Sequence, residues 1–442
     1  MSNIVKYPLY VLAFSPILAF FILLYLDRAP NWFLGAVYSF ISVVFLAEVA
    51  LKSKKIVIPF YLKLLILLFL YYLGWGIYTN FIHYNGFFGF LYKNTVLFSI
   101  FILLMVENAH FDREFIDRMI FIFKITIIIS FAISMIQVFV IPFFLIPSFL
   151  QGERSEFGLI RFPSMFSYIG VNELGFSFLP IVCLLIGYDM YYRKRPNIIL
   201  IGLSGVVAIL SSSRYIQLGF FLLLLQLVFR KKVILRNLAY TAVFILIFVA
   251  TLSFISHFLG FDVMDYYYSR IRETTYMSRV IGFQLFLKFF PQNPIFGTGE
   301  RVTHELSFEL GRASPYIHIG YLSHLYEFGI VGSIFLFGAW LSIAYVLLRS
   351  ALRTQFFGSF FGFLMFLFTN ATLVEYNLFH YGIVFTLVFQ RYFSIYATQP
   401  AVTTPASVRS SIWNDKVAAY IASIRKYGVA RVTRRGREGE GI

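Results

Sequence analysis

The sequence contains 442 residues, of which 59% are hydrophobic and 13% are charged. Soluble globular chains carry about 25% charged residues, so this composition excludes an ordinary soluble domain and indicates an integral membrane protein. The formal net charge of +16 does not indicate nucleic-acid binding, because the basic residues stand in short clusters between apolar runs, as in the loops that orient membrane helices. The single cysteine, Cys183, excludes an intramolecular disulfide and a cysteine-based zinc site.

Apolar runs of about 20 residues recur along the chain, and each is long enough to cross the hydrocarbon core of a bilayer as a helix. They lack the alternation of apolar and polar residues that the strands of a membrane barrel show. The sequence therefore predicts an all-α, polytopic integral membrane protein with about twelve transmembrane helices. In chain order, the predicted spans are 7–26, 32–51, 57–79, 91–106, 119–141, 171–191, 197–212, 215–229, 237–257, 319–348, 356–375 and 379–396.

Basic clusters on alternate connections predict how these spans are oriented. Lys52, Lys54 and Lys55 follow the second span, and similar clusters follow the fourth, sixth, eighth and tenth spans. Cytoplasmic loops are enriched in Lys and Arg, so the pattern places both termini in the cytoplasm. The long connections 142–170 and 258–317 then lie on the opposite side of the membrane, and the second is expected to contain amphipathic helices.

The chain is expected to consist of a transmembrane domain, residues 1–398, and a basic cytoplasmic tail, residues 399–442. In the tail, apolar residues recur at helical spacing with Lys and Arg between them, which is typical of a helix that lies on an anionic leaflet. A poorly ordered tail is the alternative.

Arginines near the outward side are candidates for anion binding. Arg214 stands in the turn between the seventh and eighth spans, directly after three serines; it either snorkels to lipid headgroups or binds an anion at the mouth of a cavity. Arg272 and Arg279 are seven residues apart on a predicted helix, 262–290, and therefore project from one face. Two guanidinium groups on one face suit a diphosphate, because each offers a planar fork of donors to phosphate oxygens. Pairing of one arginine with Glu273 is the alternative.

His318 is the candidate general base, because it lies at the end of the second long connection, just before the tenth span. A histidine near its reference pKa of about 6.5 accepts a hydroxyl proton near neutral pH. Helix capping or packing is the alternative. No metal is expected: His304 has no second histidine at the spacing of a zinc protease, and Asp262 and Asp265 are explained as helix caps.

Glycines mark two points in this region. Residues 297–299, Gly-Thr-Gly, predict a turn after the predicted helix has stopped. Gly329, Gly332 and Gly338 are interpreted as small residues at close helix contacts.

Four polar segments follow one another through residues 155–340. They are Arg161-Phe162-Pro163 with Asn172-Glu173-Leu174-Gly175; Ser211-Ser212-Ser213-Arg214; Ser278-Arg279 with Pro294-Ile295-Phe296-Gly297-Thr298-Gly299; and His318 with Leu325-Tyr326-Glu327-Phe328-Gly329-Ile330-Val331-Gly332. In this order and spacing they resemble the bacterial O-antigen polymerase and O-antigen ligase superfamily, which consists of integral membrane glycosyltransferases of the GT-C type.

The resemblance implies an inner-membrane enzyme with a periplasmic active site that acts on glycans carried by undecaprenyl diphosphate. The reaction it implies inverts the anomeric carbon and uses no metal or other cofactor. It also implies that Arg214 and Arg279 hold the diphosphate leaving group and that His318 activates the acceptor hydroxyl. The family's ligases commonly show His-Asn at this point, whereas this chain has His318-Ile319, which favours a polymerase over a ligase.

Further residues are expected in the substrate site. They are Arg161, Asn172, Arg272, Arg301, Tyr321 and Glu327. Tyr321 is expected to stack against a sugar ring, although tyrosines of the membrane interface have the same distribution.

Three functions are weighed. The first is a polymerase that transfers a growing lipid-linked polysaccharide, O-antigen or a related surface polysaccharide, onto a new lipid-linked repeat unit. The second is a ligase that transfers the polymer to a lipid A core, as in lipopolysaccharide biosynthesis. The third is a transporter of lipid-linked oligosaccharide, which should show midplane ionisable residues and repeat symmetry; neither is clear here. Expected partners are the undecaprenyl-diphosphate-linked oligosaccharide, membrane lipid and a chain-length regulator, with no nucleic acid.

Overall fold

The computed structural model describes most of the chain outside its long connections and its C-terminal tail. The described residues are 6–26, 31–52, 56–83, 96–140, 174–193, 195–211, 214–228, 274–299, 317, 319–371 and 381–396, with single residues and pairs between 239 and 257. Every regular element in this part is a helix, and no strand occurs in it. The predicted all-α class is therefore confirmed.

Helices stand at the positions of the predicted spans, except for 237–257, which is only partly described. They are α1 (Lys6–Leu26), α2 (Asn31–Lys52), α3 (Phe60–His83), α5 (Val96–Asn108), α6 (Arg113–Phe139), η3 (Leu174–Phe178) leading into α8 (Leu179–Tyr192), α9 (Ile198–Leu210), α10 (Arg214–Leu224) with η4 (Leu225–Leu227), α15 (Gly320–Thr354), α16 (Gly358–Asn370) and α17 (Tyr381–Tyr396). The second long connection adds α13 (Thr274–Phe289) and η6 (Phe290–Gln292).

The chain divides into two compact units, residues 1–394 and 395–442. The predicted tail, 399–442, lies outside the described residues. Within the first unit, the segments Arg113–Gln137, Gly175–Tyr192 and Gly320–Thr354 are long and apolar enough to cross a membrane, and shorter apolar helices accompany them. These findings agree with an integral membrane protein.

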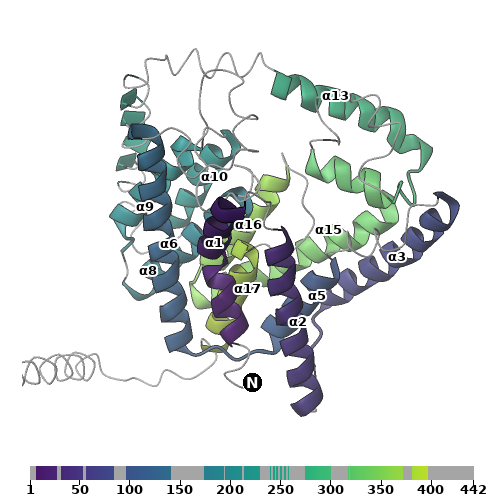
Figure 1. The fold of residues 1–442 in the computed structure, drawn as a ribbon, viewed down its shortest axis with the longest axis horizontal. Helices are drawn as coiled ribbons and strands as arrows, with labels where there is room; N and C mark the ends of the chain where they lie inside the picture. Colours follow the sequence, from purple (N-terminus) through teal and green to yellow (C-terminus); the bar gives the residue numbers. More distant parts are fainter. Residues whose placement is uncertain are drawn as a thin grey trace, which may run out of the picture. The chain divides into compact units, whose positions relative to one another are not determined.

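The helices of the first unit pack around an aromatic and aliphatic core. Helix α8 packs against α16, α6 against α9, and α3 runs beside α15 (Figure 1). Trp340 of α15 lies in this core, where its ring meets the ring of Phe366 of α16 edge to face at 5.3 Å between centroids. Such close packing is the main source of helix association in a membrane, because lipid tails are as apolar as the side chains.

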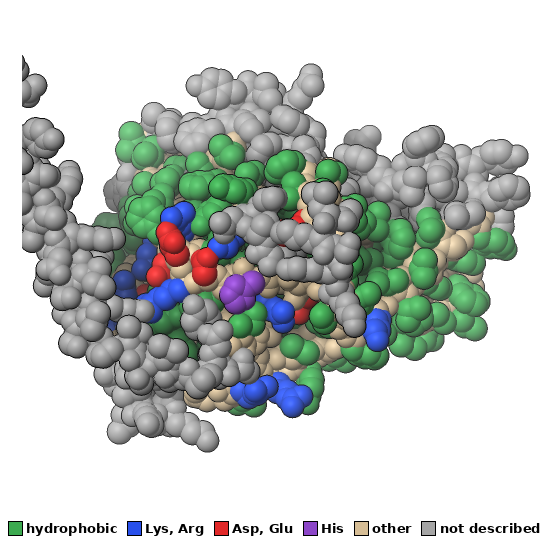
Figure 2. Space-filling model, turned by 90° about the horizontal axis from the view of Figure 1, so that it is seen from below, with side chains coloured by type: hydrophobic (Ala, Val, Ile, Leu, Met, Phe, Trp, Pro, Cys, Tyr) green, Lys and Arg blue, Asp and Glu red, His purple; other side chains and the backbone are tan. Residues whose placement is uncertain are grey.

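Charged side chains gather on one face of this unit, which Figure 2 shows from below. The start of α1 meets the start of α6 through Lys6 and Asp112. Nη1 of Arg391 on α17 lies 3.9 Å from Oε2 of Glu107 at the end of α5. The basic clusters of the sequence predict that this face is cytoplasmic.

Asp112 starts α6, because its side chain accepts a hydrogen bond from the amide of Phe115 at 2.8 Å. Burial alone would raise the pKa of the Asp112 carboxyl, but the hydrogen bonds from Lys6 and from the Phe115 amide, with the charges of Lys6 and His110, hold this pKa below its usual value. Asp112 thus serves both as a helix cap and as one half of an ion pair.

Candidate active site

The predicted site residues are described to different extents. Arg161, Asn172, Arg272, Arg301 and His318 lie outside the described residues, and Arg214 is described only as the first residue of α10. The side chains of Arg279, Tyr321 and Glu327 are described. The geometry around these three side chains, and around the motifs that contain them, therefore defines the candidate site.

Helix α15 is broken at Gly329. Its 35 residues exceed the roughly 20 that cross a bilayer, and Gly329 has φ 62° and ψ −170° inside it. This backbone conformation is accessible essentially to glycine alone. The interpretation of Gly329 as a small residue at a continuous helix contact is therefore incomplete, because this glycine divides the helix into the segments 320–328 and 330–354.

A turn is predicted at residues 297–299; the hydrogen-bonded turn lies just before it, where the amide of Gly297 donates to the carbonyl of Asn293 at 2.9 Å, and both stretches lie against this break. Gly297 and Gly299 have positive φ values of 71° and 73°. A Cβ atom on Gly297 would lie 2.7 Å from the carbonyl carbon of Phe328, and one on Gly329 would lie 2.5 Å from that of Phe296. The two backbones approach too closely for any side chain, so both positions require glycine.

Backbone hydrogen bonds join the turn to both sides of the break. The amides of Thr298 and Gly299 donate to the carbonyls of Tyr326 and Glu327 at 3.0 and 2.9 Å, and the amides of Ile330 and Val331 donate to the carbonyls of Pro294 and Ile295 at 2.9 and 3.1 Å. A break in a membrane helix leaves carbonyls and amides without helical partners, and leaving such a group bare in hydrocarbon costs several kcal/mol. The turn supplies those partners. We call residues 293–299 and 326–331 together the glycine crossing.

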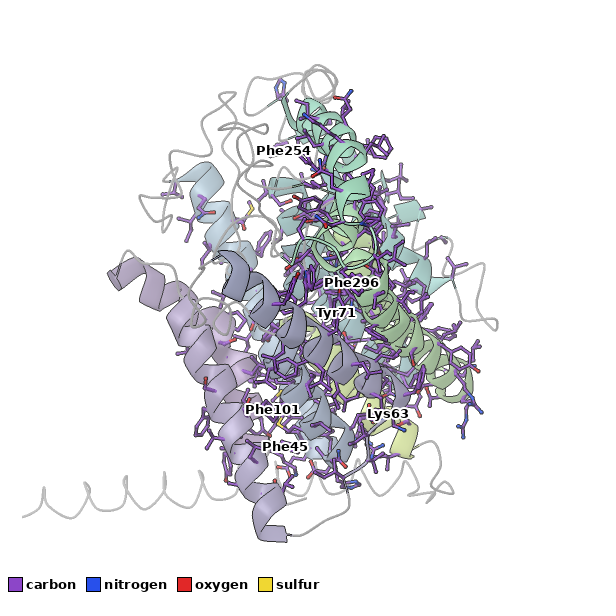
Figure 3. All side chains as sticks on the ribbon, turned by 90° about the vertical axis from the view of Figure 1, so that its right-hand side faces the viewer. Phe45, Lys63, Tyr71, Phe101, Phe254 and Phe296 are labelled. Carbon is purple, nitrogen blue, oxygen red and sulfur yellow. The ribbon has the colours of Figure 1, made fainter. Side chains whose placement is uncertain are left out.

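Tyr71 of α3 contacts both halves of the glycine crossing. Its hydroxyl lies 2.5 Å from the carbonyl oxygen of Phe296 and 3.0 Å from that of Phe328, and Figure 3 shows Tyr71 beside Phe296. The single hydroxyl proton is donated to one carbonyl at a time. The next residue, Tyr72, donates a 3.4 Å hydrogen bond to Oε1 of Glu327, whose side chain is buried.

Helix α13 carries Arg279 and packs on the first turns of α15 (Figure 1). Leu285, Phe286 and Phe289 of α13 form a small apolar cluster with Ile317 and Tyr326, and Ile319 packs against it. Ile317 and Ile319 are the two neighbours of His318. Helix α13, which contains Arg279, and the residues that flank His318 therefore pack together.

Tyr321 and His324 line the other side of the first α15 segment, toward α16. The Tyr321 hydroxyl donates to the carbonyl of Leu367 at 2.6 Å. The fully buried His324 has Nε2 at 3.3 Å from Oδ1 of Asn370. These contacts fix the first α15 segment against α16, and a sugar contact of Tyr321 stays a prediction.

Sequence reasoning missed Tyr71, Tyr72 and His324's partner Asn370. Each lies in an apolar run in which a lone polar residue has many structural explanations, and no local pattern indicates its distant partner. Among the described residues, no group of three or more His, Cys, Asp or Glu side chains is arranged to hold a metal ion.

The geometry defines a class: an all-α membrane protein in which the turn after α13 is tied by backbone hydrogen bonds to a broken apolar helix. Residues 199–337 match the protein family described as O-antigen ligase. The match runs from α9 into α15 and contains Arg214, Arg279, His318 and the whole glycine crossing. It confirms the resemblance to the O-antigen polymerase and ligase superfamily. No curated protein matches the chain.

Proposed function

We propose that the protein is a polysaccharide polymerase of the bacterial inner membrane. It transfers a growing glycan from undecaprenyl diphosphate onto a new lipid-linked repeat unit at the periplasmic face. The observation that carries this proposal is the glycine crossing inside the O-antigen ligase match. It joins the turn that follows the helix of Arg279 to α15, which begins two residues after His318 in the chain.

In this proposal, the C1–O bond to undecaprenyl diphosphate breaks and a C1–O bond to the acceptor hydroxyl forms with inversion. The leaving diphosphate takes the electron pair, and His318 accepts the hydroxyl proton. Arg279 and Arg214 bind the diphosphate. A guanidinium about 4 Å from a diphosphate oxygen contributes on the order of 4 kcal/mol at an effective dielectric constant of about 20. These arginines take the role that a metal has in other transferases, and no cofactor is part of the proposal.

The remaining predicted residues are proposed to bind the glycan and its diphosphate. They are Arg161, Asn172, Arg272, Arg301, Tyr321 and Glu327. The Glu327 carboxylate is held by Tyr72 inside the bundle, so its proposed contribution includes fixing the helix end next to the site.

A ligase is the second candidate, because the matched family is compatible with either a ligase or a polymerase. The residue after His318 argues for the polymerase. Ile319 packs against the apolar cluster of α13 and α15, whereas the ligases of the superfamily commonly have asparagine there. The amide of an asparagine at that position would be placed among apolar neighbours, where burying a polar group costs free energy unless it is hydrogen-bonded.

Transport is a weaker candidate because of the way the break in α15 is filled. Transporters use the free backbone groups of discontinuous helices to coordinate ions or substrates. Here the carbonyls of Tyr326 and Glu327 accept hydrogen bonds from the turn, and that of Phe328 accepts one from Tyr71. The break is thus engaged by the protein itself.

The orientation with both termini in the cytoplasm is part of the proposal, as is a chain-length regulator as partner. The contacts between the start of α1 and α6, and between the ends of α5 and α17, support this orientation, because they bring these helix ends to one charged face.

The test uses purified protein in detergent with a synthetic undecaprenyl-diphosphate oligosaccharide and EDTA. We expect the wild type to make a ladder of longer lipid-linked glycans, and Arg279→Ala and His318→Ala to lose it. Arg118→Ala is the matched control, since Arg118 lies on the exposed charged face beside Glu114. Transfer of the oligosaccharide to an added lipid A core, with no ladder, would indicate the ligase. A ladder that survives both substitutions would contradict the assigned roles.

A further inference from the structure

One side chain from outside the glycine crossing, Tyr71, contacts the backbone of both its segments. Among the described contacts, the carbonyls of Tyr326 and Glu327 accept from amides of the turn, whereas the carbonyl of Phe328 accepts from the hydroxyl of Tyr71. The same hydroxyl reaches the carbonyl of Phe296 on the turn. Tyr71 therefore places one donor between the turn and the end of the first α15 segment, within reach of a carbonyl on each.

The ring of Tyr71 packs into a space on α15 that Gly332 leaves open. A Cβ atom on Gly332, three residues after the break, would lie 2.6 Å from Cε1 of Tyr71. The ring also meets Phe335 edge to face at 6.4 Å between centroids. Gly332 thus leaves the space that the ring occupies, and Phe335 borders it. This second observation shows that the position of the hydroxyl is set by packing and not by the hydrogen bonds alone.

The position of Tyr71 matters because of what these two segments carry. The turn follows α13, which contains Arg279, and the first α15 segment follows His318 in the chain. If the turn slides along the break, the separation of these two residues changes, and a misplacement of about 1 Å can reduce a reaction rate by about a hundredfold.

We propose that Tyr71 is a positioning residue for the glycosyl transfer, which locks the turn 293–299 onto the broken α15 through the carbonyls of Phe296 and Phe328. Its effect on catalysis rests on the proposed function; its effect on the crossing does not. Tyr71 lies on α3, outside the matched region 199–337, so α3 is part of the functional unit and not only a membrane anchor.

The experiment compares Tyr71→Phe, which removes only the hydroxyl, with Tyr78→Phe, which removes a hydroxyl from an exposed tyrosine of the same helix. The first readout is hydrogen exchange of peptides covering 293–299 and 326–331 in the full-length protein in detergent. We expect exchange about tenfold faster in Tyr71→Phe and unchanged exchange in Tyr78→Phe. Unchanged exchange in Tyr71→Phe would overturn the lock whatever the protein catalyses.

The second readout is the rate of glycan lengthening. We expect Tyr71→Phe to lower kcat about tenfold with little change in KM for the lipid-linked substrate, because positioning acts on the transition state more than on binding. Faster exchange with an unchanged kcat would overturn the positioning role and leave a structural contact. A wild type that makes no polymer would contradict the proposed function, while the exchange readout still decides whether Tyr71 holds the crossing.

A further variant reaches the same result by another route. Gly332→Ala keeps the Tyr71 hydroxyl but fills the space that the Tyr71 ring occupies. We therefore expect the same rise in hydrogen exchange at residues 293–299. The double variant Gly332→Ala/Tyr71→Phe shows whether Tyr71 is still in place, because the Tyr71→Phe effect is then unchanged. Normal exchange in Gly332→Ala, with Tyr71 in place by this criterion, would contradict the proposed packing of the ring beside Gly332.

Discussion

Substitution of Gly329 by alanine should open the glycine crossing. Alanine at φ 62° and ψ −170° is strained by roughly 1–3 kcal/mol. The added Cβ would also lie 2.5 Å from the carbonyl carbon of Phe296, so the turn must move away. Losing two of the four backbone hydrogen bonds at about 1 kcal/mol each brings the expected loss to about 3–5 kcal/mol.

The assay is the free energy of unfolding in detergent, together with hydrogen exchange at 293–299 and 326–331. Gly74→Ala is the matched control: Gly74 lies within α3, and a Cβ there has nothing within 4 Å, so this change should be neutral or stabilising by up to about 1 kcal/mol. Equal stability and equal exchange in the two variants would refute the view that the break requires glycine.

Three further predictions concern other parts of the molecule. Asp112→Asn keeps a cap for α6 but removes the ion pair with Lys6, and should cost less than about 1 kcal/mol at neutral pH because the pair is partly exposed. The folded pKa of Asp112 is lowered, so the wild-type advantage is present above the unfolded pKa of about 4 and is lost as the pH falls through the lower folded value; an advantage that grows on acidification would contradict this. Trp340→Ala should reduce stability by about 3–5 kcal/mol by leaving a cavity in the core, whereas Leu341→Ala, at a side chain 68% exposed, should have little effect; thermal melts of equal midpoint would count against the described core. Arg279→Lys should retain only a small part of the lengthening activity, because an ammonium lacks the planar fork of donors; full activity in Arg279→Lys would show that charge alone is needed.

The helices could be predicted from the sequence because lipid imposes a simple rule on them. An apolar run of about 20 residues has to form a helix, since every backbone group must find a partner within the segment. Thus the expected spans 7–26 and 32–51 coincide with α1 and α2 to within a residue. Helix ends were less predictable: α6 begins at Arg113, six residues before the expected span, because Asp112 caps it there.

The glycine crossing could be predicted only in part. A turn near Gly-Thr-Gly was recognisable from its composition, and Gly329 stood in a motif of the resembled family. That the two meet depends on tertiary contacts, because Phe296 and Phe328 are brought to one hydroxyl of Tyr71, which is 225 and 257 residues away in the chain. A tyrosine within an apolar run gives no local indication of such a role.

The roles proposed for Arg279 and His318 rest on the family resemblance and stay predictions. The described part of the chain places the helix of Arg279 and the residues beside His318 in one apolar cluster. This packing brings α13 close to the neighbours of His318, which the distance between them in the sequence does not predict.

The most direct test of the polymerase account is a product analysis of the wild-type enzyme given lipid-linked repeat units as the only glycan. Mass spectrometry of the lipid extract should show undecaprenyl-diphosphate-linked glycans of two or more repeats, and one undecaprenyl diphosphate released for each linkage formed. Lipid-linked repeat units that stay unextended, with no undecaprenyl diphosphate released, would contradict the account.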